Sequence, residues 1–248
     1  MKTIVLGDTH GRSFWKLITH TEKPDRVIFI GDYFDSFDIP GPEQIQNFKE
    51  IIEYKRKGEC EVILLIGNHD YHYMDGIDEQ YSGYQPRLTS TIQFELKDVY
   101  HDLQMAYQMG EYLFTHAGVS SKFMNSVFGK GEWKVENIAE DINTLFKYKP
   151  LTFMFGAAVD IKKMSWLDPY GDNTEQSPIW IRPRSLMSAN MDTLKNKVIQ
   201  VVGHTEVSRI TDAIIKDGDK NRYWLIDCLG TSGQYMVIED DKVSINKI

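Results

Sequence analysis

Three short apolar runs in the N-terminal part of the chain each end in a glycine followed by polar residues. The runs cover residues 3–6, 27–30 and 62–66. Continuous runs of this length, closed by a turn residue, are typical of strands buried on both faces of a parallel sheet. The sequence therefore predicts three buried strands in this region.

The stretches between these runs carry apolar residues at helical spacing. Ser13 is placed to cap a first helix, whose apolar side consists of Phe14, Leu17 and Ile18. A second helix is predicted to begin at Pro42 or Glu43 and to end at Gly58, with an apolar face made of Ile45, Phe48, Ile51 and Ile52. This alternation of strands and helices predicts an α/β fold.

The rest of the chain continues the pattern less regularly. It predicts a helix over residues 135–146, a hairpin turn at 217–219, and strands at 112–114, 198–202, 210–215, 223–227 and 235–238. We expect a single domain over residues 1–248, with two central mixed sheets flanked by helices. The tyrosine-rich, irregular segment at about 71–107 and the segment at about 119–196 are expected to form walls around a site.

Side chains that can bind metal ions follow five of the predicted strands. Open α/β sheets bind ligands just outside the carboxyl ends of their strands, so these side chains are expected to meet. The candidate ligands are Asp8, His10, Asp32, Asn68, His116 and His204. His69 and Asp35 lie beside them in the sequence.

Carboxylate, imidazole and amide oxygen are ligands of first-row divalent ions such as Mn²⁺, Fe or Zn²⁺. A carboxylate on the central strand, Asp32, can bridge two ions, which would lower the pKa of a bridging water and hold a phosphoryl group for in-line attack. His69 could then protonate the leaving alkoxide, and Asp35 could fix the histidine tautomer. The pattern indicates hydrolysis of a phosphate ester.

Composition narrows the class of protein. The net charge of −8 disfavours a general nucleic-acid or membrane-surface binder, which would need a basic face. Cys60 and Cys228 are far apart and expected to be reduced and buried, and the chain enters a strand at once without an apolar leader. We therefore expect a cytoplasmic protein with no membrane segment.

The motifs occur in the order G-D-x-H, G-D-x-x-D, G-N-H-D, H-A-G and G-H between residues 7 and 206. In this order the sequence resembles the calcineurin-like metallophosphoesterase superfamily, and within it the phosphoprotein phosphatase branch, which includes bacteriophage lambda phosphatase and small bacterial serine/threonine phosphatases. The resemblance implies a two-sheet αββα sandwich with a dinuclear metal site at the strand ends. Mn²⁺ is the favoured metal, with Fe or Zn²⁺ as alternatives.

The resemblance also implies roles for individual residues. Asp32 would be shared by two metals, the first completed by Asp8 and His10 and the second by Asn68, His116 and His204. His69 would be the general acid, with Asp35 as its partner. The I-W-x-R-x-R motif at residues 179–184 implies that Arg182 holds phosphate oxygens, and Arg184 and Asn68 are further candidates for substrate binding.

The sequence departs from the family pattern after Asp35. Many relatives continue this motif as D-R-G, with an arginine that grips phosphate, whereas Ser36 stands here. Arg87 or Arg12 could replace that arginine. Asp70 stands where many relatives have glutamate, and Glu206 stands where other branches have a second histidine.

The function expected from these features is that of a metal-dependent phosphomonoesterase, foremost a serine/threonine protein phosphatase. Its substrates would be phosphorylated proteins or small phosphoesters. One alternative is a diadenosine-tetraphosphatase or another nucleotide-directed hydrolase, with tyrosines such as Tyr71, Tyr73 and Tyr84 stacking on bases. A second is a catalytically impaired, metal-bound scaffold, conceivable because the D-R-G arginine is missing.

Overall fold

The structure, a computed structural model, describes residues 1–157, 173–189, 194, 197–212 and 223–248. The predicted turn at 217–219, residues 213–215 of a predicted strand and parts of the 119–196 segment lie outside the described residues. The chain divides into two compact units. The first consists of Met1–Gln104, Glu206–Ile210 and Ile226–Ile248, and the second of Met105–Thr205 and Thr211–Leu225. Each unit holds one sheet, which confirms the predicted α/β class with two sheets.

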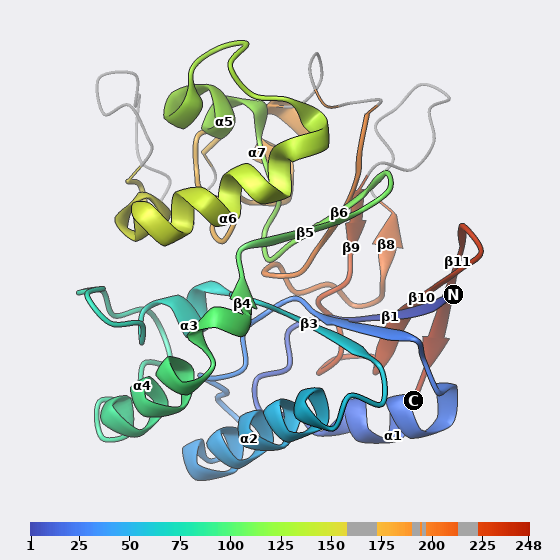
Figure 1. Cartoon of the computed structure of the whole chain (residues 1–248). Coiled ribbons are helices and arrows are strands. Elements are labelled where there is room, and N and C mark those ends of the chain that lie inside the picture. Colours follow the sequence, from blue (N-terminus) through green and yellow to red (C-terminus); the bar gives the residue numbers. More distant parts are fainter. Residues whose placement is uncertain (158–172, 190–193, 195–196, 213–222) are drawn as a thin grey trace. The chain divides into compact units, whose positions relative to one another are not determined.

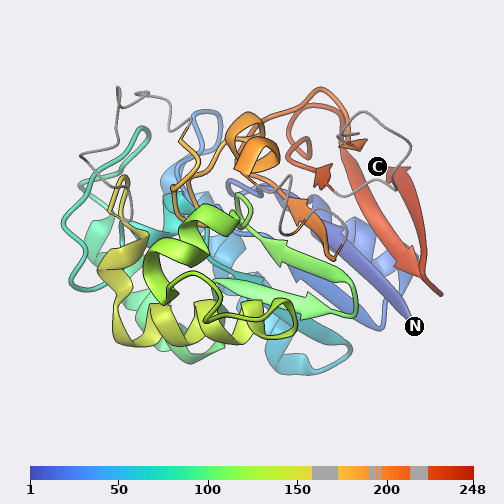
Figure 2. The same cartoon turned by 90° about the horizontal axis from the view of Figure 1, so that it is seen from above.

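The sheet of the first unit has the strand order β11-β10-β1-β2-β3-β4. Its strands are β1 (Lys2–Leu6), β2 (Arg26–Phe29), β3 (Glu61–Leu65), β4 (Leu103–Gln104), β10 (Gln234–Glu239) and β11 (Lys242–Lys247). β1 to β4 are mutually parallel, and β10 pairs antiparallel with β1. Figure 2 shows the C-terminal hairpin in red beside β1 in blue. The predicted buried strands are therefore the centre of this sheet.

The helices of the first unit are α1 (Phe14–Glu22), α2 (Gly41–Lys57), α3 (Asn68–Tyr71), α4 (Thr89–Asp98) and the 3₁₀ turn η1 (Tyr100–Asp102). In Figure 1, α1 and α2 lie along the same side of β1, β2 and β3. α2 ends at Gly58 in a left-handed conformation, as predicted (φ 67°). Its buried residues include the whole of the predicted apolar face.

Three expectations for this unit were wrong in detail. Ser13 makes no capping hydrogen bond through its side chain, and the buried side of α1 carries Trp15 and Ile18 while Phe14 and Leu17 are exposed. Trp15 occupies the buried position because its ring packs on Phe29 and its Nε1–H donates to Asn47 Oδ1 on α2 at 3.0 Å. The segment predicted to be irregular contains α4, whose short apolar pattern buries only Ile92 and Leu96.

The sheet of the second unit has the order β5-β6-β7-β9-β8. Its strands are β5 (Ala106–Met109), β6 (Tyr112–Thr115), β7 (Ile199–Val202), β8 (Thr211–Asp212) and β9 (Tyr223–Leu225). Its helices are α5 (Ser121–Phe128), η2 (Val135–Asn137), α6 (Ile138–Tyr148), η3 (Pro150–Phe153) and α7 (Pro183–Ala189). Asn143 of α6 fixes this helix to the sheet, since its Oδ1 accepts from the backbone N–H groups of Met105 and Ala106.

Among the described residues, no helix has both the length and the apolar character needed to cross a membrane.

Candidate metal centre and active site

The loops after β1, β2 and β3 approach one another closely at one edge of the first sheet. They carry Asp8, Asp32 and Asn68, which are each only 2% exposed. Gly31 has a φ of 102°, and a Cβ atom on Gly67 would lie 2.0 Å from Asp32 Oδ1. Only glycine allows this approach, so the glycines that close the apolar runs bring the candidate ligands together.

The carboxylates of Asp8 and Asp32 lie close enough together to share a cation. Asp8 and Asp32 each offer a carboxylate oxygen, and these atoms lie within 4.8 Å of one another. Two buried carboxylates at this distance repel unless a cation neutralises them. His10 Nδ1–H donates to the carbonyl oxygen of Phe34 at 2.5 Å, so the lone pair of the neutral ring is on Nε2, which lies 3.7 Å from Asp32 Oδ2. Burial lowers the pKa of His10, which favours the neutral form that binds metals.

Backbone strain is concentrated at the candidate site residues. Seven non-glycine residues of the described chain have positive φ, and four of them are His10, Asp32, Asp35 and His204, with φ between 43° and 63°. Left-handed conformations are costly for residues with a Cβ atom, and they cluster at functional sites. The strain is an independent sign that these loops hold side chains in fixed directions for function.

The second carboxylate of the G-D-x-x-D motif, Asp35, holds the candidate general acid. His69 Nδ1 lies 3.0 Å from Asp35 Oδ2, and the backbone N–H of His69 donates to Asp32 Oδ1 at 2.9 Å. Burial lowers the pKa of His69, but the charge of Asp32 and the hydrogen bond to Asp35 outweigh it and raise the pKa above its ordinary value. A protonated imidazole at neutral pH is the state that a proton donor requires.

Asp70 has a structural task. Its carboxylate is fully buried and accepts hydrogen bonds from the backbone N–H groups of Asp32, Tyr33 and Gly67 at 2.7 to 2.9 Å. It therefore ties the β2 loop to the β3 loop. The shorter aspartate fits this position because the glycines allow the two loops to approach closely.

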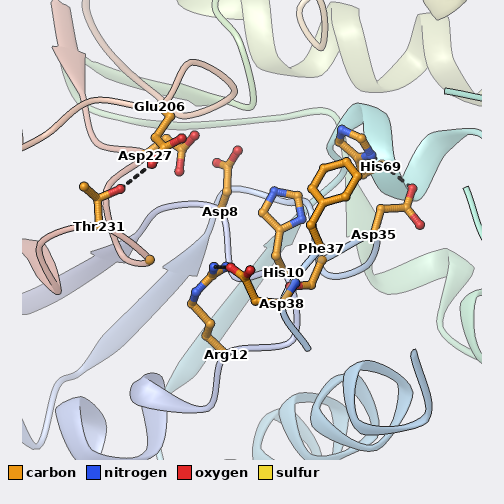
Figure 3. Close-up of a pocket in the computed structure, with 12 residues that line it drawn as sticks. Asp8, His10, Arg12, Asp35, Phe37, Asp38, His69, Glu206, Asp227 and Thr231 are labelled. Atoms are coloured by element: carbon orange, nitrogen blue, oxygen red, sulfur yellow. Dashed lines mark hydrogen bonds and ion pairs between the residues drawn. The ribbon is translucent and has the colours of Figure 1, made fainter. Parts of the chain in front are cut away.

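A pocket of about 290 Å³ opens beside these groups (Figure 3). It is lined by Asp8, His10, Arg12, Asp35, Ser36, Phe37, Asp38, His69, Glu206, Asp227, Gly230 and Thr231. The Thr231 hydroxyl donates to Glu206, and Arg12 Nη2 lies 3.4 Å from Asp38 Oδ2. Among the residues that the structure describes, Arg12 is the only lysine or arginine in this lining, whereas Arg87 is exposed and does not line it.

Sequence reasoning missed Asp227, Gly230 and Thr231 as residues of this pocket. Asp227 and Gly230 flank Cys228 and Leu229 just after β9, so a sixth polar strand end was visible in the sequence. No motif marked Thr231. Its place in the pocket depends on the turn that joins β9 to β10, where three backbone N–H groups donate to the carbonyl of Cys228.

The second unit brings together His116 and His204, which follow the parallel neighbours β6 and β7. Their ring centroids lie 5.1 Å apart, and the Gly203 N–H donates to the carbonyl of His116 at 2.7 Å. Arg182 Nη1 donates to the carbonyl of His204 and to Thr205 Oγ1, both at 3.0 Å. Arg182 therefore braces the loop that carries His204, while Arg184 is exposed in the first turn of α7.

The chain belongs to the family of calcineurin-like phosphoesterases, because the model of that family matches residues 1–225. It is accordingly a metal-dependent hydrolase of phosphoric esters. The family and the donor groups described above indicate a dinuclear site for divalent metal ions.

Solved structures with the same fold include a cold-active protein-tyrosine phosphatase of a psychrophilic Shewanella species. It is 19% identical, with a TM-score of 0.63 over 98% of this chain and 77% of that one. A point mutant of a cold-active protein tyrosine phosphatase gives 19% identity and a TM-score of 0.64 over the same shares. A metallophosphoesterase from Sphaerobacter thermophilus is 12% identical, with a TM-score of 0.53 over 100% of this chain and 88% of that one. Comparison with curated protein sequences gives no significant match.

Proposed function

We propose that this phosphoesterase is a phosphomonoesterase that removes phosphate from phosphoserine and phosphothreonine in proteins. The observation that carries the proposal is the His69–Asp35 pair at the edge of the pocket. The alkoxide of serine is a far poorer leaving group than the phenolate of tyrosine, whose conjugate acid has a pKa of about 10. A positioned proton donor therefore matters most for the alkyl esters.

The metal ligands we propose are Asp8, His10, Asp32, Asn68, His116 and His204, holding two divalent ions, Mn²⁺ before Fe or Zn²⁺. Bound ions of this kind supply a water of lowered pKa and neutralise phosphate charge. The donor set fits them because it combines two buried, closely spaced carboxylates with imidazoles and an amide oxygen. Within the site, His69 gives its proton to the departing alkoxide, and Asp35 stabilises the histidine cation until then.

Substrate contacts are proposed for Arg12 and Arg182, with Asn68, Arg87 and Arg184 as further candidates. Arg12 lines the same pocket as His10 and His69, so it is our candidate to replace the arginine missing after Asp35. Arg182 uses Nη1 to brace the His204 loop. A guanidinium has five N–H donors, so this contact is compatible with phosphate binding.

The nucleotide-directed alternative loses its main support. Tyr71 and Tyr73 are fully buried, and Tyr73 stacks on Tyr84 with ring centroids 5.0 Å apart. Tyr71 and Tyr73 therefore present no free face to a base, and one face of the partly buried Tyr84 is covered by Tyr73. Cys60 and Cys228 are both free thiols, which supports the proposed cytoplasmic location. Both were expected to be buried; Cys228 is buried, but Cys60 is only partly buried.

The test loads the protein with Mn²⁺ and compares turnover of a phosphoserine peptide, a phosphotyrosine peptide, diadenosine tetraphosphate and an aryl phosphodiester. We expect preference for the phosphoserine peptide. His69→Asn should reduce its hydrolysis by about 10²- to 10⁴-fold, whereas His20→Asn, at an exposed histidine of α1, should leave the rate unchanged.

Preference for the dinucleotide, the diester or the phosphotyrosine peptide would contradict the proposed substrate. Metal uptake without turnover of any phosphoester would instead favour a scaffold.

A further inference from the structure

A second histidine lies against the carboxylate that holds the candidate general acid. His72 is buried, with 2% of its surface exposed, and its Nε2 lies 2.7 Å from Asp35 Oδ2. His69 Nδ1 reaches the same oxygen at 3.0 Å. Asp35 Oδ2 is thus shared between two imidazoles, of which His69 also lines the pocket and His72 does not.

The hydrogen bonds of His72 determine which of its nitrogens carries the proton. The backbone N–H of Tyr81 donates to His72 Nδ1 at 3.1 Å, so Nδ1 holds a lone pair. Nε2 must then carry the hydrogen, and it lies 2.7 Å from the Asp35 Oδ2 anion. The same assignment argues against a metal ion among Asp35, His69 and His72, although their ligand atoms lie within 4.8 Å of one another, because a protonated Nε2 cannot bind a metal.

The rest of the surroundings hold His72 in one orientation. Its ring stacks on Tyr81 with ring centroids 5.0 Å apart and an interplanar angle of 10°. It also makes a T-shaped contact with Tyr73, with ring centroids 4.3 Å apart. Tyr73 donates its hydroxyl hydrogen to Asp35 Oδ1 at 2.6 Å. Both oxygens of Asp35 are therefore fixed from the protein interior, and the carboxylate cannot rotate away from His69.

We propose that His72 is a positioning residue for the proton donor: its Nε2–H lies against Asp35 Oδ2 and holds that oxygen in place, and Asp35 in turn accepts from His69 Nδ1–H, so that the proton given to the leaving group is the one on His69 Nε2. This role rests on the proposed function of His69 as general acid. The relay runs from the Tyr81 backbone through His72 and Asp35 to His69. His72 is not part of the sequence motifs, because Tyr71 separates it from the end of the G-N-H-D motif at Asp70.

The experiment uses two substrates that differ in their need for a proton donor. A phosphoserine peptide has a poor leaving group, and 2,4-dinitrophenyl phosphate has a good one that departs without protonation. In Mn²⁺-loaded enzyme, His72→Phe keeps the stacked ring and removes the donor. We expect kcat to fall about tenfold on the peptide and less than twofold on the dinitrophenyl ester, with KM unchanged.

His72→Gln, whose amide N–H can take the place of Nε2–H, should restore most of the lost rate on the peptide. The matched control is His20→Phe, at an exposed histidine of α1, which should behave as wild type. Metal content is measured for each variant to show that the site is equally loaded.

A readout independent of turnover is ¹⁵N NMR of the imidazoles in zinc-loaded protein. We expect the Nε2–H tautomer for His72, and in His72→Phe a shift of the His69 ring away from its wild-type signature. Equal loss on both substrates, no loss on either, or an unchanged His69 ring would overturn the role of His72. Absence of monoester turnover in the wild type would contradict the proposed function, and the NMR measurement would still decide the relay.

Discussion

Two pairs of buried carboxylates in the first unit contrast in how their charge is balanced. Asp35 and Asp70 are surrounded by protein donors: imidazoles, a phenol and an amide for Asp35, and three backbone N–H groups for Asp70. Asp8 and Asp32 offer oxygens within 4.8 Å of one another beside His10, whose Nε2 bears a lone pair, and Asp32 Oδ1 also accepts from the His69 backbone N–H.

A buried carboxylate that accepts several strong hydrogen bonds is stabilised as the anion without a cation. Two carboxylates close together are best stabilised by divalent ions. The contrast separates the two acids held by protein donors from the two that we propose as metal ligands, although all four stand in similar glycine-containing motifs.

The largest expected effect comes from breaking the metal-binding pair. Asp32→Asn should release bound metal and lower kcat/KM on a phosphomonoester by about a thousandfold or more, equivalent to about 4 kcal/mol. Metal analysis after dialysis and steady-state kinetics measure both effects. Asp98→Asn, at an exposed position of α4, serves as the control and should change neither. Full metal retention by Asp32→Asn would contradict the assignment.

Removing the carboxylate of Asp70 should instead act on stability. Asp70→Ala leaves three buried N–H groups without their charged acceptor, so the free energy of unfolding should fall by about 3 kcal/mol. Urea unfolding measures the change, and Asp70→Asn, which keeps one acceptor oxygen, should lose less. A loss below about 1 kcal/mol in Asp70→Ala would mean that the loops are held by other contacts.

The lowered pKa of Asp35 predicts that the free energy of unfolding depends on pH. Burial raises its pKa, but the hydrogen bonds from His69, His72 and Tyr73 outweigh this and bring it from 3.8 to about 2. The group therefore contributes stability that is complete above pH of about 4 and is lost as the pH falls through about 2, in total about 2 kcal/mol.

Urea unfolding of chelator-treated protein between pH 6 and 2 tests this contribution against Asp35→Asn. The stability advantage of the wild type should shrink as the pH falls below 4. An advantage that stayed constant down to pH 2 would show that the hydrogen bonds do not favour the anion.

The smallest expected effect comes from removing one of the hydrogen-bond donors to Asp35. Tyr73→Phe removes one hydrogen bond to Oδ1 and also the phenol oxygen that accepts from the Gln85 N–H at 2.8 Å. We expect a loss of about 1.5 kcal/mol in the free energy of unfolding. Tyr148→Phe, at a side chain that is 71% exposed, is the matched control. Equal stability of the two variants would show that the hydrogen bonds of the Tyr73 hydroxyl do not stabilise the fold.

Much of the first unit could be predicted from the sequence because its signals are local. An apolar run ended by glycine defines a buried strand, and parallel neighbours place their carboxyl ends at one edge. This was sufficient to expect Asp8, Asp32 and Asn68 on adjacent loops. The reason is that strand period and glycine conformation depend on few neighbours.

The sequence by itself determined the α/β class, the two sheets and the set of candidate ligands. Only the tertiary structure decided that Asp70 ties loops together, that His72 shares Asp35 with His69, and that Arg12 lines the pocket while Arg87 does not. These roles depend on which donors meet across distant parts of the chain. A residue type records what a side chain can bind, but its partners are chosen by packing, which no local pattern encodes.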